Sequence, residues 1–252
     1  MNDIIYTAAS GAIINQMRLE ILSNNLANLN TAGFKADKSI FKTYLPSSSG
    51  SNPSGDMSPN FACNYHVEFE GTKTDFSSGG LQYTGNVLDL ALEGDGFFCI
   101  KTQDGTRYTR NGNFTLNREG VLVTQDGLPV LGDSGPINID VKDGGNIVID
   151  EQCNISVDED QVGTLKIVDF SQPYPLKKMG DTMFAPVGKG NNEKGADNVK
   201  VTQGFIELSN VNAIGVMTEM IEVMRGYESY QKVMQFVDNI TSKAINEVGR
   251  VT

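Results

Sequence analysis

The chain has 252 residues, an apolar content of 39%, a net charge of −11 and no tryptophan. Nucleic acids and anionic membrane surfaces repel so acidic a chain, so we expect neither as a partner. Cys63, Cys99 and Cys153 are widely spaced and odd in number, which fits neither a disulfide framework nor a zinc site. We also expect no membrane-spanning helix and no cleaved signal peptide, because no apolar run approaches about 20 residues and the first residues lack positive charge.

Residues 1–33 are expected to form a long amphipathic helix, with Gly33 as its left-handed end. Positions of one stripe recur at alternating steps of three and four, and only Asn15 among them is polar. A stripe with this period buries itself against a partner helix and favours a supercoil. The stripe consists of Ile5, Ala8, Ala12, Asn15, Leu19, Leu22, Leu26 and Leu29.

The middle of the chain has a different pattern. Residues 34–64 are expected to be a connecting segment, and the Ser-, Gly- and Pro-rich part at 46–60 is typical of a flexible spacer. Residues 65–208 alternate apolar and polar positions, and Asp-Gly pairs punctuate them as hairpin turns do. We therefore expect ten or more short strands in an antiparallel sandwich or irregular barrel, without the strand–helix alternation of a Rossmann or TIM fold.

Residues 209–252 are expected to form a second long helix, with Ser209 and Asn210 capping its first turn. Its stripe consists of Val216, Met220, Val223, Tyr227, Tyr230, Met234, Val237, Thr241, Ala244 and Val248. The predicted fold class is α+β, in which the two long terminal helices form a coiled coil and a mainly antiparallel β domain is inserted between them.

Enzyme-like patterns are weak in this sequence. Residues 132–136 are similar to the nucleophile segment of trypsin-like proteases, but a triad needs a base and the single histidine, His66, lies in no matching motif. We therefore interpret Ser134 as part of a turn. The acidic run 158–160 lacks the ligand spacing of an EF-hand, and Gly188-x-Gly190 lacks the Lys-Ser/Thr of a phosphate loop. We expect no catalytic residue, metal, cofactor or small-molecule substrate.

Four strings, in order, resemble those of the bacterial flagellar rod and hook proteins. They are SNNLANLNTAGFK at 23–35, TGNVLDLALEGDGFF at 84–98, YTRNGNF at 108–114 and GFIELSNVN at 204–212. The chain length suits the FlgF and FlgG types of rod protein. Residues 5–8, 128–137 and 230–233 favour the FlgF type of the proximal rod, and the FlgG type of the distal rod is the alternative.

The resemblance implies a structural subunit of the basal-body rod, exported by the flagellar type III apparatus without a cleaved signal and located across the periplasm. Its partners would be copies of itself, neighbouring rod proteins and the export apparatus. The terminal helices would polymerise into an inner tube that transmits torque. Two other classes stay open: a secreted enzyme acting on proteins or glycans, and an adaptor that binds axial subunits transiently.

The subunit interface expected from the stripes and the Asn-rich string comprises residues from both ends of the chain. These residues are Ile5, Ala12, Leu19, Leu22, Asn24, Asn25, Leu26, Asn28, Thr31, Gly33, Phe34, Ser209, Asn210, Asn212, Met220, Val223, Tyr227, Tyr230, Met234 and Val237.

Overall fold

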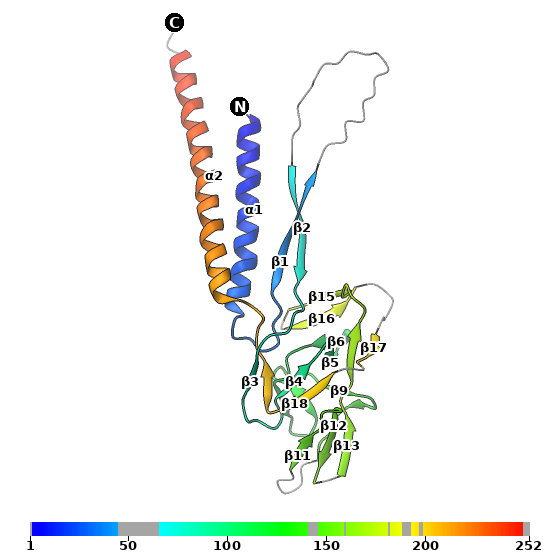
Figure 1. Ribbon diagram of the computed structural model, residues 1–252. Coiled ribbons are helices and arrows are strands. Elements are labelled where there is room, and N and C mark those ends of the chain that lie inside the picture. Colours follow the sequence, from blue (N-terminus) through cyan, green and yellow to red (C-terminus); the bar gives the residue numbers. More distant parts are fainter. Residues whose placement is uncertain are drawn as a thin grey trace, which may run out of the picture. The chain divides into compact units, whose positions relative to one another are not determined.

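The computed structural model describes residues 2–44, 66–140, 146–158, 160–180, 182–187, 193–196 and 199–248. The spacer expected at 46–60, Cys63 and the glycines at 188 and 190 lie outside these residues. Two helices, α1 (Asn2–Ala27) and α2 (Ala213–Val248), flank a region of short strands (Figure 1). Within the described ranges, neither helix is long and apolar enough to cross a membrane.

The chain divides into two compact units. Unit 1 combines three segments that are far apart in sequence, Met1–Leu26, Asp37–Lys73 and Ala213–Thr252. Unit 2 consists of Ala27–Ala36 and Thr74–Asn212. Unit 1 therefore contains both helices, and unit 2 contains most of the strands.

Unit 1 also holds a two-stranded ladder of β1 (Asp37–Tyr44) and β2 (His66–Thr74). The rings of Phe41 and Phe69 lie 5.9 Å apart across this ladder. Aromatic pairs at this separation stabilise neighbouring strands. The segment 34–64, expected to be a connecting segment, thus contains the strand β1.

The largest sheet of unit 2 has six strands joined by antiparallel pairings. Their order across the sheet is β15 (Leu176–Lys178), β16 (Met183–Pro186), β6 (Gly105–Thr109), β5 (Phe97–Thr102), β14 (Ile167–Phe170) and β17 (Glu193–Gly195).

Smaller antiparallel sheets complete unit 2. One is three-stranded, with the order β11 (Ile147–Ile149), β12 (Asn154–Val157) and β13 (Asp160–Thr164). The two-stranded sheets are β18 (Lys200–Gln203) with β4 (Leu90–Glu93), β19 (Phe205–Glu207) with β3 (Leu81–Tyr83), β7 (Phe114–Leu116) with β8 (Leu122–Thr124), and β9 (Leu131–Gly132) with β10 (Gly135–Pro136).

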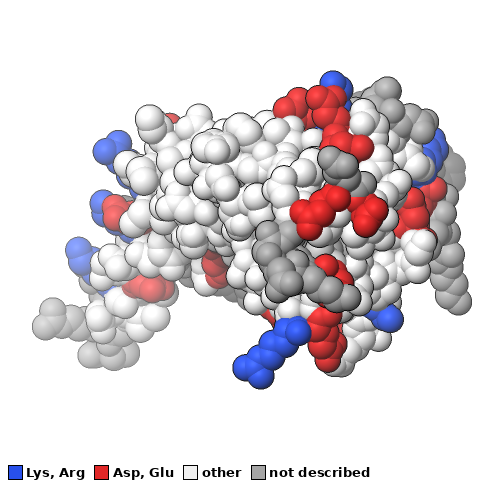
Figure 2. All heavy atoms as spheres, turned by 90° about the horizontal axis from the view of Figure 1, so that it is seen from below, with Lys and Arg blue, Asp and Glu red and all other residues white. Residues whose placement is uncertain are grey.

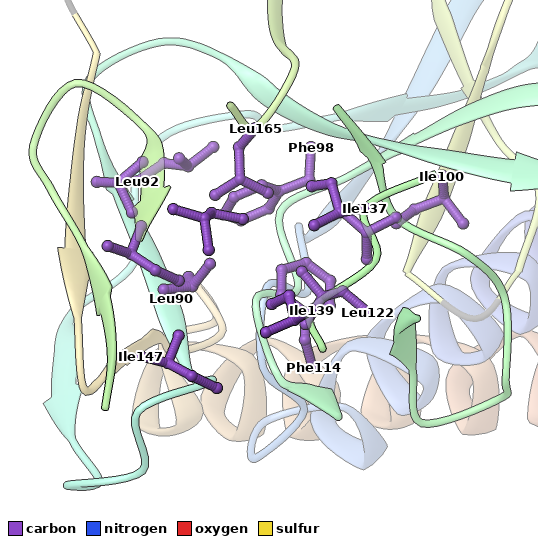
Figure 3. Close-up of a cluster of buried hydrophobic side chains, with 14 of the residues drawn as sticks. Leu90, Leu92, Phe98, Ile100, Phe114, Leu122, Ile137, Ile139, Ile147 and Leu165 are labelled. Carbon is purple, nitrogen blue, oxygen red and sulfur yellow. The ribbon is translucent and has the colours of Figure 1, made fainter. Parts of the chain in front are cut away.

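Strand β5 separates two hydrophobic cores. Phe98 and Ile100 belong to the larger core, drawn in Figure 3, whereas Phe97 and Cys99 belong to a second core rich in aromatic rings. Successive strand residues point to opposite faces, so a run that is apolar at every position indicates a strand buried on both sides. The predicted antiparallel β region is confirmed, and β5 is a covered central strand within it.

The protease-like segment is the turn that the sequence indicated. Gly132 pairs with Gly135 in the antiparallel β9–β10 ladder, so Asp133 and Ser134 form the connection. The Ser134 side chain is exposed.

Figure 2 views one face of the molecule, on which acidic side chains lie in several separate groups. In the parts of the chain that are described, no three His, Cys, Asp or Glu side chains gather in a metal-binding arrangement.

Candidate assembly interface

Helices α1 and α2 lie side by side in unit 1 and run in opposite directions (Figure 1). Two glycines mark close contacts between them. A Cβ atom at Gly11 would lie 2.5 Å from Cζ of Tyr230, and a Cβ atom at Gly226 would lie 2.8 Å from Nδ2 of Asn15. The absence of a side chain on each helix therefore makes room for a side chain of the other.

An ion pair continues this contact. Nη2 of Arg18 donates a hydrogen bond to Oε1 of Glu219 at 2.9 Å, and the Arg18 guanidinium also lies 5.9 Å from the ring centre of Phe41. Both charged side chains remain partly exposed, so the pair itself contributes little to stability. Its role is positional, because Arg18 touches both α2 and β1.

The two predicted stripes face each other within one chain. The best-covered members are Ala8, Ala12, Leu22, Val223 and Val237, each at most 7% exposed. Ten others are half-buried, whereas Tyr230 is 36% exposed and Ala244 is also exposed. The half-buried members are Ile5, Asn15, Leu19, Leu26, Leu29, Val216, Met220, Tyr227, Met234 and Thr241.

A second set of apolar side chains on α2 is left uncovered. Exposed fractions range from 42% for Val233 and Ile240 to 80% for Ile214. These residues lie outside the predicted stripe, although steps of three and four link most of them within two groups, at 214–224 and at 233–240. The exposed residues are Ile214, Met217, Ile221, Met224, Val233, Phe236, Ile240 and Ile245 on α2, with Ile4, Tyr6 and Ile13 on α1.

Asn25 connects α1 to the first strand. Its side-chain Nδ2 donates to the carbonyl oxygen of Asp37 at 2.8 Å, and its Oδ1 accepts from the Asp37 N–H at 3.0 Å. Asn25 is only 3% exposed. Because both polar atoms of the amide bind one residue of β1, Asn25 performs a structural task inside unit 1.

Glu207 is the centre of a buried ionic cluster in unit 2. Its Oε1 accepts from Lys35 Nζ at 2.7 Å and from the Gly79 N–H at 2.8 Å, and its Oε2 lies 3.5 Å from Arg110 Nη1. The side chains of all three charged residues are at most 2% exposed. Burial lowers the pKa of Lys35, and the neighbouring carboxylate of Glu207 partly offsets this effect.

The cluster joins the chain near three of the four segment ends of unit 2, those at residues 36, 74 and 212. The Gly33 N–H donates to the Glu207 carbonyl at 2.7 Å, and Lys35 also donates to the Ser77 carbonyl at 2.8 Å. Gly33 has a φ of 66°, and a Cβ atom there would lie 2.3 Å from the backbone nitrogen of Asn111. Only glycine fits this close, left-handed position.

Asn210 reinforces the same junction, and this corrects its predicted role as a helix cap. Its Oδ1 accepts from the Ala36 N–H at 2.8 Å, and its Nδ2 donates to the carbonyls of Asp75 and Ser77 at 2.8 and 3.0 Å. Helix α2 begins only at Ala213, too far along the chain for this amide to cap it. The Asn210 side chain instead joins residue 36, which precedes the β1–β2 segment, to residues 75 and 77, which follow it.

The other predicted interface residues of this junction have separate surroundings. Phe34 is 4% exposed, and Lys178 Nζ lies 3.7 Å from its ring centre. Thr31 Oγ1 donates to Asn28 Oδ1 at 3.2 Å, and Ser209 Oγ accepts from the backbone N–H two residues later. Asn24 is exposed on α1, and Asn212 directly precedes α2.

The described cysteines are held as thiols in hydrophobic surroundings. Burial raises the pKa of Cys99 to about 12 and that of Cys153 to about 11. Thiols with raised pKa values are poor nucleophiles at neutral pH. The side chain of His66 lies outside the part of the molecule that is described.

Three family models match the chain, in the order of its segments. They are "Flagella basal body rod protein" at residues 5–35, "Flagellar hook protein FlgE/F/G D1 domain" at 91–165, and "Flagellar basal body rod FlgEFG protein C-terminal" at 202–247. The first and last contain most of α1 and α2, and the second covers strands of unit 2.

Relatives match over almost the whole chain. The flagellar basal-body rod protein FlgF of Caulobacter vibrioides is 31% identical, with all of both chains covered. The rod protein FlgG of Bacillus subtilis is 34% identical over 96% of this chain and 97% of the relative. FlgF of Rhizobium meliloti is 34% identical over 97% of each chain. On the strength of these full-length matches, the chain belongs to the family of flagellar basal-body rod proteins.

Proposed function

We propose that the chain is a structural subunit of the bacterial flagellar basal-body rod, and that it works as a building block rather than as an enzyme. The observation that carries the proposal is the helix pair of unit 1. It joins the two ends of the sequence and still leaves apolar side chains exposed on α2. Exposed apolar surface of this kind marks a protein–protein contact.

The assembly would be built from contacts between helix pairs of neighbouring copies, packed as a coiled-coil tube. Repeated heterologous contacts that do not close into a ring produce a helical array. Exposed members of the predicted interface, such as Tyr230, would take part in these contacts. Buried members, such as Gly33 and Phe34, would act indirectly by fixing the ends of unit 2.

The ionic cluster around Glu207 suits a subunit that carries mechanical load. It gathers the segments near residues 33–36, 75–79 and 207–210, which adjoin the places where the chain leaves unit 2. A force that reaches unit 2 through one of these segments is therefore shared with the other two. In the proposed rod, torque would pass through this joint.

Within the rod, we propose the FlgF type, with the FlgG type as the alternative. Export would proceed through the flagellar type III apparatus, and the rod would place the protein across the periplasm. Residues 5–8, 128–137 and 230–233 support the FlgF type, and relatives of both types match at similar identity. Position along the rod separates the two types, because one is proximal and the other distal.

Incorporation of a seam variant tests the proposal. Leu26→Asp introduces a charge at a half-buried position of α1 in unit 1. We expect this variant to be missing from purified basal bodies, whereas Glu20→Asp, an exposed change on the same helix, is incorporated normally. Circular dichroism of the purified Leu26→Asp chain should retain the β signal of unit 2. Normal amounts of Leu26→Asp in basal bodies would contradict the proposal.

A further inference from the structure

Six of the uncovered apolar residues of α2 form two patches with the same spacing. We call Ile214, Met217 and Ile221 the lower patch, and Val233, Phe236 and Ile240 the upper patch. In each patch the second residue lies three positions after the first, and the third lies four positions after the second. Each lower-patch residue therefore has an upper-patch counterpart 19 positions later.

The two patches face different directions. In an α-helix, 19 residues correspond to five full turns plus about 100°, and to a rise of about 28 Å. Measured from Val223, which faces α1, Met217 is rotated by about 120° one way and Phe236 by about 140° the other way. The helix pair thus presents one patch on each of two flanks, at different heights, and two neighbours can bind at once.

We propose, building on the rod function above, that the lower patch of one copy packs against the upper patch of a second copy. The pairs would be Ile214 with Val233, Met217 with Phe236, and Ile221 with Ile240. The steps match in this order only when the two α2 helices are parallel, as they are for copies related by a helical axis. The neighbouring copies are then staggered by about 28 Å along the helix.

Charge is complementary at the end of this contact. In this pairing each residue of one copy lies level with the residue 19 positions later in the other copy. Lys243 of the second copy is therefore level with Met224 of the first, one helical turn from Glu228 of the first copy. Both charged side chains are exposed in the single chain. They lie at the rim of the paired patches, where an ion pair orients the partners.

The size of the contact predicts that a second copy binds only within an assembly. The six side chains offer on the order of 700 Å² of exposed surface, well short of the roughly 1,200 Å² at which stable interfaces begin. One such contact does not hold a dimer, whereas each copy inside an array makes two. The methionine at the centre of the lower patch adapts its shape to the Phe236 ring.

Cysteine crosslinking in assembled rods tests the pairing. Met217→Cys and Phe236→Cys are introduced together into a motile strain whose chain has serine at positions 63, 99 and 153. Basal bodies are purified and treated with a short bismaleimide. We expect covalent dimers and larger oligomers of this chain from the double variant. We expect none from either single variant, because position 217 faces 236 and not another 217.

A matched control moves the upper-patch cysteine from position 236 to position 238. Asp238 lies at nearly the same height as Phe236 but about half a turn around the helix, so Met217→Cys with Asp238→Cys should give no oligomers. A second pair, Ile214→Cys with Val233→Cys, should repeat the positive result if the first pair disturbs packing.

Three results would overturn the pairing while the rod function stands. They are basal bodies that contain the chain but yield no oligomers from either pair, dimers from Met217→Cys alone, and crosslinks only to a different protein. Absence of the unmodified chain from basal bodies would instead refute the rod function and, with it, this pairing.

Discussion

The Glu207 cluster offers the sharpest test of how unit 2 is held together. The change Glu207→Gln keeps the shape of the side chain but removes its charge. It leaves Lys35 and Arg110, each at most 2% exposed, without their carboxylate partner. Removing one partner of a buried ion pair costs about 3–5 kcal/mol, because the remaining charge stays buried without compensation.

The assay is equilibrium unfolding in guanidinium chloride, followed by the fluorescence of the tyrosines, because the chain has no tryptophan. Glu151→Gln is the matched control. Glu151 accepts from Lys200 at 2.8 Å, but both side chains are more than 60% exposed, so we expect a loss below about 1 kcal/mol.

A companion variant separates charge from packing. A triple variant in which Lys35, Arg110 and Glu207 are each replaced by methionine has no buried charge left in the cluster. It should therefore recover much of the stability that Glu207→Gln loses. A Glu207→Gln loss no larger than that of Glu151→Gln would refute the reasoning. It would mean that the cluster is hydrated or dispensable.

Three further outcomes are expected. Gly79→Ala should destabilise unit 2 by about 3 kcal/mol in the same denaturation assay, because its Cβ would lie 1.9 Å from a backbone oxygen, whereas Gly163→Ala meets open space and should not. Leu22→Ala should cost about 2–5 kcal/mol and lower thermal stability of the helical signal in circular dichroism, and the exposed Ile13→Ala should cost less than about 1 kcal/mol. The unfolding free energy should fall as pH rises above about 9, because the unfolded Cys99 thiol then ionises while its pKa of about 12 keeps the folded thiol protonated. Between pH 9 and 10.5 this contributes about 2 kcal/mol, which Cys99→Ala should abolish; equal pH slopes for both proteins would exclude this cause.

Local patterns in the sequence were sufficient for the terminal helices and the β region. The period of three and four identified which sides of α1 and α2 are covered, and Val223 and Val237 are indeed buried. Period-two alternation and turn residues identified antiparallel strands between the helices. These features depend on residues close in sequence, so the pattern contains the necessary information.

The junction of unit 2 was beyond such reasoning. Lys35 and Glu207 are 172 positions apart, and nothing in either local string indicates that a lysine and a glutamate meet in a buried site. The same holds for Asn210, which looks like a helix cap but bonds to backbone groups more than 130 positions away. Polar residues in the strings 23–35 and 204–212 were therefore assigned to contacts between copies and, for Ser209 and Asn210, to helix capping, but not to a buried junction.

The second apolar surface of α2 was missed for another reason. A stripe analysis selects the strongest repeat, and the repeat through Val223 is longer than the one through Met217. A helix that contacts its own chain through one surface and other copies through a second surface carries both repeats. The exposed fraction of each side chain, which only the structure supplies, separates the two surfaces.

The most direct test of the rod function is electron microscopy of basal bodies purified from a strain that lacks this gene. We predict basal bodies truncated within the rod, with full length restored by the wild-type gene. Truncation near the inner membrane would support the FlgF type, and truncation farther out would support the FlgG type. Complete rods and motile cells without the gene would contradict the account.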